Sequence, residues 1–432
     1  MDALTSSERS AAGPGPAGPG PAADAAGVAA RDSYGRLLAL LAASTSDLAA
    51  AEDALADAFE QALRTWPSAG VPGNPDAWLL TVARNRLRDH WKSARVQRAS
   101  PLDAGQDELV HVDDVDVGAI PDRRLELMLV CAHPAIERGV RTPLMLNTVL
   151  GCTAEQVGRA FSVPASTMAT RLVRAKKRIK AARIPFRIPD REDLAARMAA
   201  VLEAVYGAYV IDWATTGPQA RPLPSEALHL AEVLTALVPA DPEAHGLAAL
   251  VQLSAARAPA RTDPSGRFVA LADQDPSRWN PHLINRAHEH LRAAHARGQL
   301  GRFQIEAAIQ AVHCARRQGG GTDWPTLLTL HRLLHAVAPS LGSGVALAAV
   351  TAEVDGPAAG LATLDALLEG AGPHARRFQP ARATRAHLLD QLGRSEEAVA
   401  AYESAIALTH DTAERQYLQH RRDRSRESCR DG

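Results

Sequence analysis

The chain of 432 residues is long enough for two to four domains, at about 100 to 200 residues per domain, and its net charge of −1 excludes an overall positive field for binding nucleic acid. Aromatic residues make up only 4% of a chain rich in alanine and leucine, which favours helices and argues against an all-β sandwich or barrel. Four scattered cysteines, the lack of an eighteen-residue apolar run and the lack of a signal-peptide pattern lead us to expect an all-α cytoplasmic protein with no membrane partner.

The first hundred residues divide into a tail and a pair of helices. Residues 1–30 contain the Gly/Pro run from Gly13 to Pro21, which predicts a disordered tail. In residues 31–98, the Pro/Gly cluster from Trp66 to Pro75 predicts a loop between two long helices. The first helix, Asp47 to Trp66, is expected to bury an apolar stripe and to expose an acidic face that suits a protein partner. This acidic face consists of Glu52, Asp53, Asp57 and Glu60.

The second helix, residues 75–98, carries an apolar ridge and a basic ridge side by side. The apolar ridge is Leu79, Ala83 and Leu87, and the basic ridge is Arg84, Arg88, Lys92 and Arg95. Trp91 lies beside the basic ridge. Basic and aromatic side chains on one helix suit single-stranded or melting DNA, because an indole stacks on an unpaired base while the cations follow the backbone. Burial of Trp91 in the core is the alternative.

A polar, acidic stretch at residues 99–120 predicts a flexible linker, and a second helical block at residues 121–187 contains a helix-turn-helix. The turn is Ser162-Val163-Pro164. The helix after it has an apolar stripe of Met168, Leu172, Ala175 and Ile179 and an opposite stripe of Thr167, Thr170, Arg171, Arg174 and Arg178. Residues 165–187 hold eight Lys or Arg and no Asp or Glu. Hydroxyl and guanidinium donors in this pattern are typical of a recognition helix in the major groove of DNA; a merely solvated basic face is the alternative.

The second half of the chain is predicted to be helical throughout, with an extension domain at residues 188–300 and a further domain at residues 301–432. Small and large apolar residues from Ala386 to Leu408 are spaced as in one unit of a tetratricopeptide repeat. Such a unit cannot bury its apolar face alone, so we expect neighbouring helices to stack on it and a role in interaction or packing. A helical array that packs only on its own domains is the alternative.

Two DNA-suited helical domains joined by an acidic linker resemble the layout of an extracytoplasmic-function RNA polymerase sigma factor. The stretch Asp47 to Gln61 looks like sigma region 2.2, Trp78 to Arg86 is similar to regions 2.3 and 2.4, and Asp122 to Arg183 resembles region 4. The resemblance implies three sets of site residues. They are Glu52, Asp53, Asp57 and Glu60 for binding core polymerase; Arg84, Asn85, Arg88, Trp91, Lys92 and Arg95 for the minus-ten element; and Ser166, Thr167, Thr170, Arg171, Arg174, Lys177 and Arg178 for the minus-thirty-five element.

The resemblance extends into the second half, where Arg261 to Asp263, Leu271 to Trp279 and Gln304 to His313 look like the C-terminal extension of a sigma-24-like subgroup. The chain departs from that subgroup at Ala56-Asp57, at Cys131 to Pro134 and at Val210 to Trp213. We expect promoter DNA and core RNA polymerase as partners. We also expect the extension to regulate activity in cis, supplemented by a possible regulatory protein partner.

Two other classes of function are weighed against a sigma factor. A helix-turn-helix regulator with a tetratricopeptide-like sensor domain explains residues 121–187 and the second half, but leaves the acidic and basic helices of residues 47–98 without a role. A metal protein or enzyme would use Cys131, His133 and Cys152, or the histidines His282, His288, His290 and His295. Neither set has a recognised ligand spacing, and no Gly-rich phosphate loop or GxSxG motif occurs, so we expect no metal, no cofactor and no catalysis.

Overall fold

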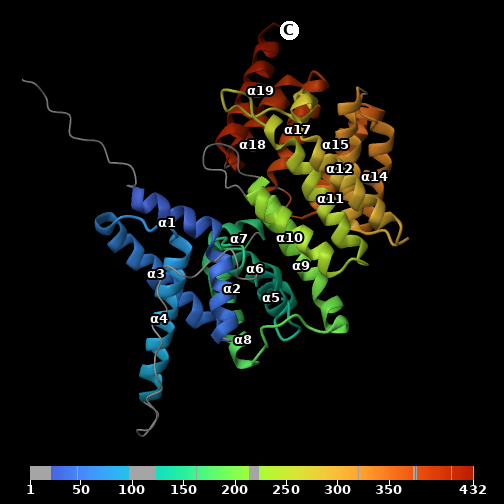
Figure 1. Cartoon of the computed structure of the whole chain (residues 1–432). Helices are drawn as coiled ribbons and strands as arrows, with labels where there is room; N and C mark the ends of the chain where they lie inside the picture. Colours follow the sequence, from blue (N-terminus) through green and yellow to red (C-terminus); the bar gives the residue numbers. More distant parts are fainter. Residues whose placement is uncertain are drawn as a thin grey trace, which may run out of the picture. The chain divides into compact units, whose positions relative to one another are not determined.

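The computed structural model describes residues 21–45, 47–96, 123–161, 163–213, 223–319, 321–372, 375, 377–409 and 411–431. Figure 1 shows helices joined by loops in these segments, and the expected all-α class is confirmed. No strand forms within these segments, where a single β-bridge pairs Thr262 with Phe268. The chain divides into two compact units, Met1–Val201 and Leu202–Gly432. The acidic linker expected at residues 99–120 lies outside the described residues.

The first helix, α1 (Pro21–Asp32), forms in part of the stretch expected to be a disordered tail. That expectation is wrong for residues 21–30, and residues 1–20 lie outside the described part of the chain. Alanine, which has the highest helix propensity, dominates α1, and Pro21 suits the first helical position. Ala22, Ala26 and Ala29 recur at helical spacing and are buried. Packing of these small side chains therefore stabilises α1. A sequence pattern based on large apolar residues does not reveal such a helix.

The predicted pair of long helices forms as α3 (Leu48–Ala69) and α4 (Pro75–Val96). The carboxylate of Asp47 caps α3 by accepting a hydrogen bond from the amide of Ala50. The helix α3 continues past its expected end at Trp66 and stops at Gly70, whose φ of 85° favours glycine. Trp66 and Trp78 meet edge to face with ring centroids 5.5 Å apart, which fixes the two helices against each other.

A short helix, α2 (Tyr34–Thr45), lies at the centre of the first unit. Its residues from Leu37 to Ala42 are all buried, and a helix that is apolar all round needs neighbours on every side. It packs against α3 and α4 and also against α5 (Arg124–Cys131), which begins the second helical block. The block continues with α6 (Arg138–Thr148), α7 (Ala154–Ala160) and α8 (Ala165–Ala181).

The helix α9 (Arg191–Trp213) contains the boundary between the two units, and the finer domain limits expected from the sequence stay predictions. By length and composition, Glu192–Ile211 could cross a membrane, but half of the window that meets this test is buried inside the protein. The second unit continues with α10 (Leu223–Leu237), α11 (Pro242–Arg257), α12 (Pro281–His295) and α13 (Arg302–Cys314). Against α11, whose residues are mostly buried, pack α10, α12 and α13.

The second unit ends in a series of helices that pack on their neighbours along the chain. They are α14 (Trp324–Val337), α15 (Leu341–Asp355), α16 (Pro357–Gly370), α17 (Gln379–Gln391), α18 (Ser395–Leu408) and α19 (Thr412–Asp431). Ala386, Leu389, Ala398 and Tyr402 lie in one core between α17 and α18, as the repeat-like spacing predicts. The pairwise stacking expected of these helices is present, and their assignment to tetratricopeptide repeats stays a prediction.

Candidate DNA-binding and protein-binding surfaces

The helix-turn-helix predicted in the second block is built by α7 and α8. Thr153 accepts a hydrogen bond from the amide of Gln156, whose side chain accepts one from the amide of Thr153, so α7 begins with a capping box. The turn then passes so close to Gly158 that a Cβ there would lie 2.7 Å from the carbonyl oxygen of Val163. Glycine is needed at this position because the backbones of α7 and the turn touch directly.

The apolar stripe of α8 is buried and its basic stripe is exposed. The four predicted core residues are at most 7% exposed; they are Met168, Leu172, Ala175 and Ile179. The seven residues predicted for the minus-thirty-five element are all exposed: Ser166, Thr167, Thr170, Arg171, Arg174, Lys177 and Arg178. Arg178 donates a hydrogen bond of 3.4 Å to the carbonyl oxygen of Ala135. The other cations of this stripe extend from a helix without Asp or Glu, as contact with phosphate and base edges requires.

The basic ridge of α4 also faces solvent where it is described. Arg84, Asn85, Arg88 and Trp91 are exposed, and Arg88 donates a hydrogen bond of 3.3 Å to the Asn85 side chain. Trp91 is 41% exposed, so its burial in the core is wrong and its indole is accessible to a stacking partner. Lys92 and Arg95 belong to α4, but their side chains lie outside the described part.

Three of the four acids predicted to form the exposed face of α3 do so, and one does not. Asp53, Asp57 and Glu60 are exposed, and Glu60 pairs with Arg64 one turn later. The exposure expected for Glu52 is wrong, because its side chain is only 18% exposed and its Oε1 lies 2.7 Å from Nζ of Lys176. Burial raises the pKa of Glu52, while the nearby ammonium of Lys176 acts in the opposite direction.

A second ion pair joins α3 to α8. Nζ of Lys180 lies 2.6 Å from Oδ2 of Asp47, the residue that caps α3. Hydrogen bonds from Lys180 and from the amide of Ala50 oppose burial and lower the pKa of Asp47 overall. Sequence reasoning missed Asp47, Lys176 and Lys180 as paired residues, because their partners lie more than a hundred positions away and leave no local signal.

An open cleft of about 530 Å³ lies between α3, α4 and α8, next to these ion pairs. Its charged lining includes Asp53 and Asp57 from α3, Arg86 and Asp89 from α4, and Lys180 from α8. The predicted acidic face of α3 therefore forms one wall of a cleft, beside the basic helices that the sequence assigns to DNA.

Two of the candidate metal ligands, Cys131 and His290, make other contacts. Cys131 is buried and lies 3.5 Å from the hydroxyl of Thr148, and burial raises the pKa of its thiol to about 12. His290 is 5% exposed and lies between His245, at 2.9 Å, and Glu232, at 3.1 Å. In the described part of the chain, no three His, Cys, Asp or Glu side chains converge in a way that could hold a metal ion.

The motif at residues 271–279 has a structural explanation. Trp279 is 1% exposed, and the guanidinium of Arg316 lies 5.6 Å from the centre of its ring. Arg316 also donates hydrogen bonds to the carbonyl oxygens of Leu271, at 2.7 Å, and Ala272, at 2.9 Å. The motif residues therefore hold an irregular connection between α11 and α12 rather than lining a site.

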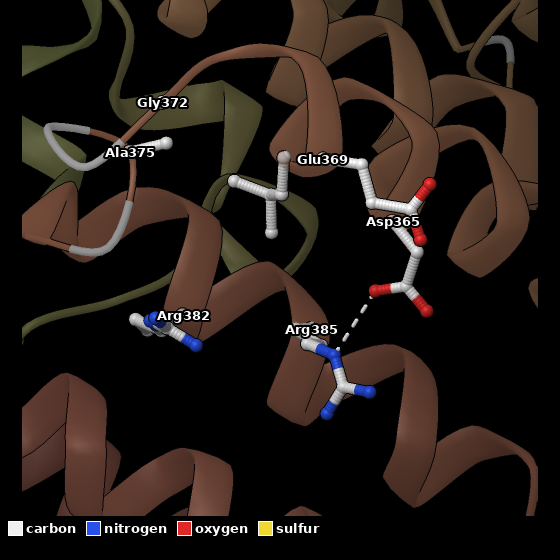
Figure 2. Close-up of a pocket in the computed structure, with 7 residues that line it drawn as sticks. Asp365, Glu369, Gly372, Ala375, Arg382 and Arg385 are labelled. Carbon is white, nitrogen blue, oxygen red and sulfur yellow. Dashed lines mark hydrogen bonds and ion pairs between the residues drawn. The ribbon is translucent and has the colours of Figure 1, made fainter.

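A larger open pocket of about 610 Å³ lies in the second unit, between α16 and α17. Figure 2 shows Arg385 directed toward Asp365, and an ion pair of 3.1 Å joins them. Glu369 and Arg382 are the other charged residues of the described lining, which includes no serine, cysteine or histidine. The two carboxylates and two guanidinium groups of this described lining balance in charge, and the described lining includes no nucleophile paired with a base.

Comparisons with known proteins match two parts of the chain to families. Residues 30–96, which contain α2, α3 and α4, match sigma-70 region 2. Residues 197–295, which run from α9 through α12, match a family of unknown function, DUF6596. The chain is similar to an uncharacterized protein of Rhizobium meliloti (strain 1021), with 35% identity over 378 residues that make up 85% of this chain and 88% of that protein. No solved structure matches the chain.

Proposed function

Because this chain belongs to the same family as the Rhizobium meliloti protein and carries sigma-70 region 2, we propose that it is a sigma factor of the extracytoplasmic-function type that directs promoter recognition. Sigma-70 region 2 is a domain of factors that act in transcription initiation with RNA polymerase core and promoter DNA. One observation carries the proposal further. The unit that contains this domain also contains a helix-turn-helix whose recognition helix exposes only neutral and basic side chains to solvent.

The proposed assignment gives each exposed surface of the first unit a task. The stripe of α8 that contains Arg171 and Arg174 reads the minus-thirty-five element, because its donors reach base edges and phosphates in a major groove. On α4, Trp91 and Arg88 contact the minus-ten element as its strands separate. The acidic face of α3, with Asp53 and Asp57, docks on core polymerase. The protein is not an enzyme, acts in the cytoplasm and uses its second unit to regulate initiation in cis.

The alternative, a helix-turn-helix regulator with a helical sensor domain, is supported by α7 and α8 alone. It leaves the match to sigma-70 region 2 and the exposed Trp91 of α4 without a role. A measurement of DNA binding with and without core polymerase distinguishes the two functions. A sigma factor needs core polymerase to bind promoter DNA specifically, whereas a regulator binds its operator unaided.

The test is binding and runoff transcription with the full-length protein, purified core polymerase and a promoter selected from genomic fragments. We expect specific transcripts only when the protein and core polymerase are both present. As a matched pair of variants, Asp53→Lys with Asp57→Lys reverses two exposed acids of α3, whereas Glu353→Lys with Asp355→Lys reverses two exposed acids of α15 in the second unit. Loss of core binding in the first and not in the second supports docking through α3. Sequence-specific binding of duplex DNA by the protein alone favours the regulator instead.

A further inference from the structure

Two histidine side chains meet between α11 and α12 in the second unit. Nδ1 of His245, on α11, lies 2.9 Å from Nδ1 of His290, on α12, and the ring centroids are 5.2 Å apart. His290 is 5% exposed, and His245 is half-buried. The separation of the two nitrogens is that of a hydrogen bond, so one of them carries a hydrogen and the other accepts it.

The outer nitrogen of each ring faces a group that accepts hydrogen bonds. Nε2 of His290 lies 3.1 Å from Oε1 of Glu232, on α10, and Nε2 of His245 lies 3.2 Å from the carbonyl oxygen of Pro239. Arg286 donates to both carboxylate oxygens of Glu232. Burial acts to raise the pKa of Glu232, but the hydrogen bonds from Arg286 and His290 lower it below its usual value, so this carboxylate is ionised. Both outer nitrogens therefore carry a hydrogen.

These contacts fix the number of protons on the pair. Two outer nitrogens and one inner nitrogen each need a hydrogen, which makes three, whereas two neutral imidazoles carry two. If both rings were neutral, two lone pairs would face each other, and if both were charged, two N–H groups would do so. The hydrogen bonds are complete only when His245 and His290 together hold one proton more than two neutral rings.

The extra proton belongs on His245. Burial lowers the pKa of His290, although the hydrogen bond to Glu232 acts in the opposite direction. His290 is therefore the neutral ring, which donates from Nε2 to Glu232 and accepts at Nδ1. His245, the more exposed ring, is the imidazolium, which donates from Nδ1 to His290 and from Nε2 to Pro239.

Charged groups on the neighbouring elements favour one proton on the pair and oppose a second. The carboxylate of Glu232 attracts the first. Arg297, which follows α12, donates to the same Pro239 carbonyl oxygen as His245, at 3.1 Å, and repels a second positive charge. Other charged groups of α11, α12 and α13 have partners of their own: Arg286 with Glu289, Glu243 with the amides of Phe303 and Gln304, and Arg302 with Glu306.

We infer that His245 and His290 share one proton, and that this proton joins α12 to α10 and α11. The pair is a proton-binding site inside the segment that matches DUF6596, and this inference does not rest on the proposed function. Without the proton, the Nδ1 contact between α11 and α12 is lost, and the buried His290 keeps an acceptor without a donor, which costs stability. The packing of α12 therefore depends on pH near neutrality.

The direction of the pH dependence follows from the protons on the closed and open forms of α12. In the open form each histidine returns to a pKa of about 6.5, so opening releases a proton above that pH and takes one up below it. Stability is therefore lost as pH rises toward the point at which the closed pair gives up its proton. It is also lost as pH falls through the lowered pKa of His290. Each effect changes the opening equilibrium by up to about tenfold per pH unit.

The test is amide hydrogen exchange of α12 in the full-length protein, measured by mass spectrometry between about pH 5.5 and pH 8.5 with and without EDTA. Each rate is divided by the intrinsic exchange rate at the same pH. Opening of α12 should be rarest near pH 6.5, the ordinary pKa of histidine, and should increase severalfold per pH unit on both sides. Two neutral histidines predict an increase on the acid side alone, so the alkaline increase identifies the shared proton.

The variant His245→Asn separates the hydrogen bond from the proton. Its side-chain amide can donate to Nδ1 of His290 without binding a proton. The alkaline increase in opening should therefore disappear, while the acid increase, which comes from His290, should remain. His282→Asn, at an exposed position of α12, is the matched control and should keep both.

An NMR measurement on the unmodified protein keeps the test independent of how His245→Asn folds. In protein labelled with ¹⁵N-histidine, one ring should carry hydrogens on both nitrogens above about pH 7, where ordinary histidines are neutral. Its Nδ1 should show a coupling across the hydrogen bond to the Nδ1 of a second, neutral ring.

Three results overturn the shared proton. The first is the lack of an alkaline increase in the unmodified protein, or an increase that persists in His245→Asn. The second is NMR spectra in which every ring is neutral at about pH 7. The third is an alkaline increase that occurs only without EDTA, because a metal ion then lies between the rings.

Discussion

At the scale of single residues, position on a helix decides which charges are available for binding. Arg171 and Arg174 extend into solvent from the face of α8 opposite Leu172, whereas Lys176 points to α3 and is occupied by Glu52. Sequence periodicity separates the buried face from the exposed one, because that separation is local to one helix. It does not show which exposed lysine meets an acid from another helix.

Arg171→Ala and Arg174→Ala should each weaken binding at the minus-thirty-five element by about 1 to 3 kcal/mol, which is roughly 5- to 150-fold. Each change removes an exposed donor and leaves the buried stripe of α8 intact. Footprinting of the polymerase complex over a range of salt concentrations measures the effect, with Arg332→Ala, at an exposed position of α14, as a control. A loss that is equal for all DNA sequences and lowers the salt slope by about one marks a phosphate contact. An unchanged footprint contradicts the assignment.

A buried histidine makes stability depend on pH. His331 is 7% exposed, and burial lowers its pKa to about 4. A lowered pKa in the folded state means that stability is fully present above about pH 6.5, the unfolded pKa, and is lost as pH falls toward 4. At pH 5 this one residue should reduce the free energy of unfolding by about 2 kcal/mol relative to pH 7.

The variant His331→Leu should therefore show a smaller loss of stability between pH 7 and pH 5, by about 2 kcal/mol. Urea unfolding of the full chain at both pH values measures the difference. His282→Ala, at an exposed position of α12, serves as the control and should retain the dependence of the unmodified protein. If His331→Leu and the unmodified protein lose the same stability between pH 7 and pH 5, protonation of His331 does not contribute to the pH dependence.

At the scale of elements, the sequence predicts best those helices whose pattern is set by their own large side chains. Leu79, Ala83 and Leu87 of α4 and Met168 and Leu172 of α8 are buried as their spacing predicts. The helix α1 was overlooked because its buried face consists of alanines, which also occur on exposed faces. The contacts between α3 and α8 could not be predicted, because ion pairs between distant segments depend on how the helices pack and not on any local period.

The helix-turn-helix depends on one close approach between elements. Alanine is favoured over glycine in a helix by about 1 kcal/mol, yet Gly158→Ala should lower the thermal stability of the first unit. Its Cβ would lie 2.7 Å from the Val163 carbonyl oxygen, and relieving such crowding typically costs about 1 to 3 kcal/mol. Thermal unfolding followed by circular dichroism measures the change, with Gly139→Ala in α6 as the matched control. Equal or higher stability in Gly158→Ala shows that the turn adapts without cost.

At the scale of the whole molecule, a nearly neutral chain separates its charge into local surfaces. The net charge of −1 conceals eight Lys or Arg without an acid over residues 165–187.

The helix α9 supplies residues to both units. In the first, Arg197 is 5% exposed and donates a hydrogen bond of 3.0 Å to the carbonyl oxygen of Leu129 in α5. In the second, Tyr206 packs on Phe303 at 5.5 Å. A cut at Arg187, which the sequence favours, therefore removes part of the first unit.

Truncation is the prediction that concerns the role of the second unit. A chain that ends after Trp213 keeps Arg197 and its hydrogen bond to α5, and it should unfold at a higher temperature than a chain that ends after Arg187. If residues 214–432 regulate initiation in cis, the chain that ends after Trp213 should change runoff transcription severalfold relative to the full chain. A gain indicates that the second unit inhibits, and a loss with intact core binding indicates that it activates. Suppose that the full chain and the chain ending after Trp213 transcribe equally over a range of salt concentrations, and that circular dichroism shows both to be folded. The second unit then has no part in initiation and serves another partner.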